Sequence, residues 1–231
     1  MKILKICIDA GHHGKQNRSK VVPEYYEAEM NWKLHLLLKK YLEEYGVEVT
    51  TTRSKQTTVL GTIARGKKAK DCELFLSLHS NAYDPESLDC PLVIVPLDGT
   101  GDELGRKLAD CIASVMETSQ PGRIWTRKKD SGGEWYGVLQ GTSAVGVTGL
   151  ILEHSFHSNT RSAKWLLDDS NLDKLAKAEA DLIAAHYGLK KPGTIYRVQI
   201  GAYTVKANAE AALKKAQKAG FTDAFIKESE V

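Results

Sequence analysis

The sequence predicts an α/β fold, with a mostly parallel, twisted sheet flanked by helices and a small βαβ appendage at the C-terminus. Short apolar runs rich in β-branched residues alternate with longer segments whose apolar residues recur every three or four positions, as in proteins with parallel sheets. The chain has 231 residues, 42% of them hydrophobic, which is enough for one full core and an appendage. The segment LKKPGTI, residues 189–195, has the composition of a linker.

The core strands are expected where apolar runs are short and bounded by turn residues. These runs are residues 2–10, 47–53, 72–82, 91–97 and 149–156. Helices are expected where the apolar spacing follows the helical period, and Gly46 suits the end of the first one. These segments are residues 27–46, 58–70, 101–118, 160–169 and 171–188. In the appendage we expect a strand at 196–204, a helix at 208–221 and a short strand at 222–229.

Charge and composition exclude several classes of protein. The net charge of +3 is too small to indicate a nucleic-acid-binding protein. No apolar stretch approaches the roughly 18 residues of a membrane span, so none is expected. Four cysteines, at 7, 72, 90 and 111, form no CxxC pair, which argues against a cysteine zinc site and favours reduced, structural thiols.

Polar, metal-binding side chains follow three of the expected strands. His12 and His13 follow the first strand, His79 and Asn81 end the third, and Glu153 ends the last. Because ligands bind beyond the carboxyl ends of parallel strands, these side chains are expected to converge if the strands are neighbours. Two histidines and one glutamate with an open position form a catalytic zinc set, and a further carboxylate could act as a base.

Each of these residues also has an ordinary structural interpretation. His12 could decorate a turn and His79 could be a core histidine. Glu27, at the start of the first long helix, could stabilise the helix dipole, and Glu153 could belong to a buried ion pair. Spacing alone leaves these alternatives open, because dispersed ligands are less diagnostic than a compact motif.

Four short motifs occur in an order that resembles a known family. DAGHHG at 9–14, EAEMN at 27–31, SLHSNA at 77–82 and LEHSFHSN at 152–159 resemble the zinc-dependent N-acetylmuramoyl-L-alanine amidases of bacterial autolysins and phage endolysins. The resemblance covers residues 1–188, which it identifies as a zinc amidase catalytic domain. Each motif is weak alone, whereas four in order are specific.

The resemblance assigns roles position by position. His12, Glu27 and His79 match the family's zinc ligands, and Glu153 matches its catalytic carboxylate. Glu27 is preferred to Glu29 because it lies four residues before Asn31, as in the family motif.

The motifs also depart from the family pattern. His13 stands where glycine is usual, and His154 and His157 are unusual neighbours of the catalytic glutamate. We expect Asn81, His154 and His157 to contact the substrate.

The resemblance implies a Zn²⁺ enzyme that cleaves peptidoglycan between N-acetylmuramic acid and L-alanine. Two alternatives are a zinc peptidase or carboxypeptidase acting on the stem peptide, and a non-catalytic wall-binding protein. The N-terminal segment has no sustained apolar stretch and no cleavage site, so we expect no signal peptide. We therefore expect synthesis in the cytoplasm and action on the wall after holin- or lysis-dependent release.

The tail carries a second resemblance. YRVQIGAYTVKANAEAALKKAQKAGF resembles half of a SPOR-type, peptidoglycan-binding repeat, which makes residues 196–231 a partial wall-binding module. A single half would leave a sheet edge and an apolar face exposed. We therefore expect that it could pair with the same half of a second chain to form a homodimer.

Overall fold

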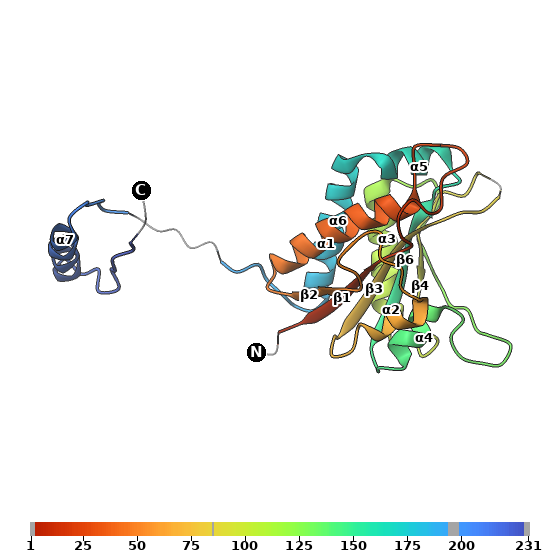
Figure 1. Ribbon diagram of the computed structural model, residues 1–231, viewed down its shortest axis with the longest axis horizontal. Helices are drawn as coiled ribbons and strands as arrows, with labels where there is room; N and C mark the ends of the chain where they lie inside the picture. The colour runs from red at the N-terminus through yellow and green to blue at the C-terminus, as the bar shows by residue number, and fades with distance from the viewer. Residues whose placement is uncertain (1–2, 85, 194–198, 229–231) are drawn as a thin grey trace. The chain divides into compact units, whose positions relative to one another are not determined.

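The computed structural model describes residues 3–84, 86–193 and 199–228. The chain divides into two compact units, Met1–Pro192 and Gly193–Val231 (Figure 1). No helix among these residues is both long enough and apolar enough to cross a bilayer.

Unit 1 is built on a six-stranded sheet with the order β2-β1-β3-β6-β4-β5. The strands are β1 (Lys5–Ala10), β2 (Glu48–Thr51), β3 (Leu74–Asn81), β4 (Leu92–Ile94), β5 (Arg123–Trp125) and β6 (Thr148–Phe156). The pairs β1–β2, β1–β3 and β3–β6 are parallel, whereas β4 runs antiparallel to β6. The expected mostly parallel sheet is therefore confirmed, and β1, β3 and β6 lie side by side.

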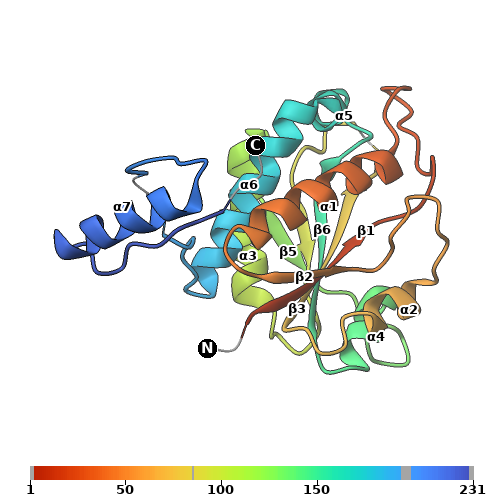
Figure 2. The ribbon, with the colours of Figure 1, turned by 60° about the vertical axis from the view of Figure 1, so that its left-hand side comes forward.

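Helices cover both faces of this sheet (Figure 2). They are α1 (Glu27–Glu43), α2 (Thr62–Lys67), α3 (Asp102–Met116), α4 (Gly137–Ser143), α5 (Thr160–Leu167) and α6 (Asp169–His186). The larger core lies under α1, α3 and α6, where Leu34, Ile112 and Leu175 pack with Ile8 and Leu76 of the sheet. The smaller core lies under α4, where Val138 and Leu139 pack with Phe75 and Ile151.

The alternation of side chains along each strand assigns residues to these two faces. Ile6 and Ile8 of β1 belong to the larger core, and Cys7 belongs to the smaller one. Asp9 therefore faces the side of α2, where Arg65 pairs with it through its Nε, 2.8 Å from Oδ1. Burial raises the pKa of Asp9, but the hydrogen bonds and charge of Arg65 outweigh burial and hold that pKa below its usual value.

Two elements of unit 1 were not predicted, β5 and α4. The helix α4 contains two glycines and crosses α2 at very short range: a Cβ on Gly66 would overlap the backbone of Val138 and Gly141. Here glycine serves packing between helices, so that local helix propensity was a poor guide.

The described residues of unit 2 form one helix, α7 (Lys206–Lys218), as expected. The two strands expected beside it are absent from residues 199–204 and 222–228, and the rest of those segments, 196–198 and 229, lies outside the described residues. The βαβ expectation is therefore corrected to a single helix with irregular flanks in the part that the structure describes.

Candidate functional site

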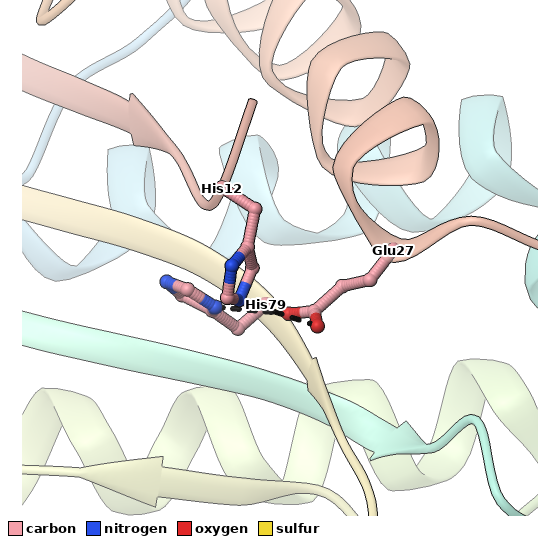
Figure 3. Close-up of side chains that lie close together, drawn as sticks. All are labelled: His12, Glu27 and His79. Atoms are coloured by element: carbon pink, nitrogen blue, oxygen red, sulfur yellow. Dashed lines mark hydrogen bonds and ion pairs between the residues drawn. The ribbon is translucent and has the colours of Figure 1, made fainter. Parts of the chain in front are cut away.

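His12, Glu27 and His79 meet at the carboxyl ends of β1 and β3 (Figure 3). One ligand atom from each side chain lies within 4.8 Å of the others. The three residues come from the turn after β1, the first position of α1 and the end of β3, which are far apart in the sequence. The structure thus brings together the three ligands that the sequence motifs indicated.

The turn that carries His12 has an unusual backbone. His12 has a φ of 58°, in the left-handed region that residues other than glycine seldom adopt, although asparagine, aspartate and histidine do so more often than the others. The preceding Gly11 leaves space for the imidazole of His79, because a Cβ at position 11 would overlap that ring. The two imidazoles consequently lie edge to face, with ring centroids 4.9 Å apart.

Glu27 is the centre of the cluster and is buried. Its Oε1 accepts a hydrogen bond from the backbone N–H of Ser80 at 3.0 Å and lies 2.9 Å from Nδ1 of His79. Its Oε2 accepts from Nδ2 of Asn17 at 2.7 Å and lies 3.3 Å from Nε2 of His12. Burial raises the pKa of Glu27, but the two histidines outweigh it and hold that pKa well below its usual value.

The donor set fits a zinc ion. Two imidazole nitrogens and one carboxylate are ordinary zinc ligands, and ligand atoms around a tetrahedral ion lie about 3.4 Å apart. The spacing of 3.3 Å between Nε2 of His12 and Oε2 of Glu27 agrees with that geometry. Burial also lowers the pKa of His79 below its usual value, although Glu27 opposes this shift, and a neutral imidazole is the form that binds metals.

Glu153 lies beside this cluster on the neighbouring strand. It pairs in register with His79, and both residues follow the same alternation toward the α2–α4 face. Its Oε2 is buried and has no hydrogen-bond partner among the described residues. Burial raises the pKa of Glu153 well above its usual value, and the negative charge of Glu27 raises it further. An unpaired carboxyl group is therefore available next to the donor set.

A cavity of about 360 Å³ opens over these groups. Its walls include His12, Glu27, His79 and Glu153, together with Asn17, Arg18, Ser80, Asn81, Ala82 and His157. Asn81 and His157 thus lie where a substrate could contact them. His157 is held by Ser80, whose Oγ is 2.9 Å from its Nδ1, and its ring stacks on Tyr25.

His154 does not reach the cavity, and its expected contact with substrate is corrected. It is fully buried, with Nδ1 2.9 Å from the carbonyl oxygen of His79 and Nε2 2.7 Å from Oε1 of Glu179 on α6. Burial lowers its pKa, but the charge of Glu179 and hydrogen bonds outweigh burial and raise it above its usual value. Successive residues of a strand point to opposite faces, so His154 must face the larger core when Glu153 faces the cavity.

Sequence reasoning missed Asn17, Arg18 and Ser80 at this site. The Nδ2 of Asn17 lies 3.0 Å from Nε2 of His12 and also contacts Glu27, so that it joins two of the ligands. Ser80 lies within the SLHSNA motif, but it binds Glu27 through its backbone N–H, which every residue type except proline supplies. His13, in contrast, is not among the cavity-lining residues.

Comparison with known families gives two matches. The family model described as N-acetylmuramoyl-L-alanine amidase matches residues 6–185, and the SPOR domain model matches residues 169–228. The second match begins within α6, a helix of unit 1, and extends through α7. Both matches agree with the resemblances that the sequence motifs indicated.

Individual relatives point the same way. The chain is 27% identical over 231 residues to the N-acetylmuramoyl-L-alanine amidase CwlM of Bacillus licheniformis, covering 97% of this chain and 85% of that protein. It is 35% identical over 74 residues to the sporulation-specific N-acetylmuramoyl-L-alanine amidase of Bacillus subtilis (strain 168), covering 31% of this chain and 29% of that protein.

A solved structure shares the fold. The catalytic domain of CwlV, an N-acetylmuramoyl-L-alanine amidase from Bacillus (Paenibacillus) polymyxa var. colistinus, superposes with a TM-score of 0.69 at 21% identity. The match covers 81% of this chain and all of that one. At this level of identity, the likeness establishes the α/β architecture.

Proposed function

The chain belongs to the N-acetylmuramoyl-L-alanine amidase family, whose model matches residues 6–185, and we propose that it is a zinc-dependent hydrolase of peptidoglycan. It cleaves the amide bond between N-acetylmuramic acid and L-alanine. The observation that carries the zinc dependence is the convergence of His12, Glu27 and His79, with the unpaired carboxyl group of Glu153 on the adjacent strand.

His12, Glu27 and His79 would hold the ion. A bound zinc supplies a Lewis acid that polarises the scissile carbonyl and makes a water molecule more acidic. The protein fixes this donor set through Ser80, which donates to Glu27, and through Asn31, whose Nδ2 donates to the carbonyl oxygen of Gly11 at 3.3 Å. Such bonds to the ligands and their backbone orient the set before substrate arrives.

Glu153 is the proton carrier of the proposed reaction. Its carboxylate accepts a proton from the attacking water and delivers that proton to the departing amide nitrogen. No other group hydrogen-bonds its buried Oε2 among the described residues, so that oxygen is free for this transfer.

The tail is proposed to bind the cell wall and to associate with a second copy. The SPOR match through α7 supports wall binding. Large apolar side chains are exposed in the segments before and after α7, among them Ile200 and Phe225. They support self-association, because a unit this small cannot bury them itself. Release through a holin or by lysis remains a prediction from the sequence.

Glu153→Gln tests the proposed chemistry. This change keeps the size of the side chain but removes its basic oxygen. We expect an unchanged zinc content and a loss of turnover on purified peptidoglycan of at least about 100-fold, the usual contribution of a general acid–base group. The matched control is Glu103→Gln, an exposed glutamate on α3, which should retain full activity.

The products discriminate the amidase from the alternatives. An amidase releases intact stem peptides from the glycan and creates no new reducing ends. Cleaved stem peptides would indicate a peptidase instead. Turnover by Glu153→Gln at the wild-type rate would contradict the role proposed for this residue, and zinc-loaded protein without any hydrolysis would favour a wall-binding protein.

A further inference from the structure

Arg18 gives the cavity a fixed positive charge. Among the described residues that line the cavity, it is the only lysine or arginine. It follows Asn17 directly, and the Nδ2 of Asn17 contacts both His12 and Glu27. The guanidinium therefore belongs to the wall of the proposed catalytic site, and the family motifs assign it no role.

The side chain of Arg18 is held in place on one edge. Its Nε donates a hydrogen bond to the carbonyl oxygen of Pro23 at 2.7 Å, and its guanidinium carbon lies 5.8 Å from the centre of the Tyr26 ring. Arg18 and Tyr26 also form an isolated antiparallel bridge. One hydrogen bond and one ring contact thus favour this orientation of the exposed side chain, which reduces the entropy lost on binding.

The turn that follows Arg18 is hydrogen-bonded to residues of the cavity wall. The buried Ser19 donates from its Oγ to the carbonyl oxygen of His157 at 2.7 Å and accepts from the N–H of Val22 at 3.0 Å. The hydroxyl groups of the buried Tyr25 and Ser80 lie 2.7 Å apart. These contacts tie residues 18–26 to the loop after β6 and to the end of β3.

The Nη1 and Nη2 groups of Arg18 have no hydrogen-bond partner among the described residues, since its one bond there uses Nε. Their N–H groups have the planar geometry that binds a carboxylate through two parallel hydrogen bonds. The sugar side of the scissile amide offers hydroxyl and neutral amide groups, whereas a stem peptide offers carboxylates. The unused donors therefore fit the peptide side of the substrate.

We propose that Arg18 binds the free carboxylate of the stem-peptide residue that follows L-alanine and so makes the enzyme prefer this residue in its acidic form to its carboxamide. The proposal rests on the proposed function. Two residues of extended peptide span about 7 Å, so this carboxylate can lie within the same cavity as the scissile bond.

The test compares two soluble muropeptides that differ only in this group, one with the carboxylate and one with the carboxamide. Wild-type protein should show a kcat/KM about 10-fold higher for the carboxylate, as expected for loss of one charge-assisted contact. Arg18→Met should bring the ratio of the two values close to one, mainly through a higher KM for the carboxylate. Arg18→Lys should keep an intermediate ratio, because lysine retains the charge without the planar fork.

Lys20→Met is the matched control. Lys20 is exposed on the same turn and does not line the cavity, so its removal changes net charge equally and should leave the ratio at the wild-type value. A wild-type ratio near one, or an equal loss on both muropeptides in Arg18→Met, would overturn the proposal. The unfolding temperature of each variant reports separately on folding.

A binding measurement distinguishes a failure of the Arg18 contact from a failure of the proposed amidase function. The affinities of both muropeptides are measured by calorimetry in the Glu153→Gln protein, with and without the Arg18→Met change. If wild-type protein cleaves neither muropeptide, the amidase function fails, yet a binding preference that depends on Arg18 would still support the carboxylate contact. Equal binding of both muropeptides would contradict it even in an active amidase.

Discussion

His35 is a buried histidine outside the catalytic site. It lies on the inner side of α1, where its Nδ1 donates to the carbonyl oxygen of Trp32 and its ring lies against the indole, with centroids 4.3 Å apart. Burial lowers the pKa of His35 to about 4, and the charge of Arg53 lowers it too, although the Trp32 carbonyl acts in the opposite direction. The folded protein therefore keeps this ring neutral in mild acid.

This shift predicts how stability changes with pH. Between about pH 6.5, the ordinary value, and about pH 4, the unfolded chain binds a proton at His35 that the folded chain does not bind. The free energy of unfolding should thus fall as the pH drops through this window, with a contribution of up to about 1.4 kcal/mol per pH unit. In His35→Leu that contribution disappears, so its curve should be flatter. Urea unfolding at several pH values, with a chelator present, measures the difference, and parallel curves would contradict the prediction.

Among individual residues, the sequence predicted which side chains form the candidate metal site but did not predict every side-chain direction. His12, Glu27, His79 and Glu153 converge because the ends of neighbouring strands converge, which the order of motifs indicated. The expectation for His154 was wrong although strand alternation predicts its direction once Glu153 is placed in the cavity. Asn17 and Arg18 lie on an irregular turn, for which no periodicity exists to assign a direction.

Among the elements, the loop after β2 supports the turn that carries His12. The buried Arg53 donates to the carbonyl oxygens of Ala10, Gln56 and Thr58, the latter two at 3.1 and 3.2 Å. Gln56 in turn bonds Gly14 twice, accepting its N–H at 3.1 Å and donating from Nε2 to its carbonyl oxygen at 3.2 Å. The loop therefore holds the turn on both sides of His12.

Arg53→Lys should weaken this support. Lysine cannot reach three carbonyl oxygens with one planar group, so we expect the free energy of unfolding to fall by about 2 kcal/mol. We also expect zinc to bind about 10-fold more weakly, as when other supports of metal ligands are removed. Competition with a chromophoric chelator, at a temperature where the variant is fully folded, measures the affinity. Arg123→Lys, at an exposed position of β5, is the control, and wild-type zinc affinity in Arg53→Lys would exclude this role.

The elements that sequence patterns identified are those with long, regular apolar faces, such as α1 and β6. The missed β5 is a short strand with both end residues exposed, so no apolar run marks it as the run at 91–97 marks β4. The helix α4 is encoded by its contact with α2 across Gly66 and Gly141. The expected strands of the tail illustrate the opposite error. Their residues alternate as strands do, but a strand also needs a partner, and no described residue of unit 2 provides one.

In the molecule as a whole, the two units differ in how completely they bury their apolar residues. Unit 1 has two cores of fully buried side chains on either side of its sheet. Within α7, only Ala216 is buried. Two aromatic residues that follow this helix, Phe221 and Phe225, are 63% and 65% exposed. Unit 1 thus has what it needs to fold alone, whereas unit 2 leaves large apolar side chains exposed, which is why we propose that it associates with a second copy.

This difference predicts the effect of removing the tail. A chain that ends at Pro192 should keep the unfolding temperature of unit 1 and its cleavage of soluble muropeptides, because the site and both cores lie within it. It should no longer co-sediment with purified cell walls.

In analytical ultracentrifugation, the full chain should form a concentration-dependent dimer, and the shortened chain should stay a monomer. Phe225→Ser should weaken the dimer and Lys218→Ser, the exposed control, should not. A full chain that stays monomeric at all concentrations would contradict the proposed dimer, because association with a second copy must increase with concentration.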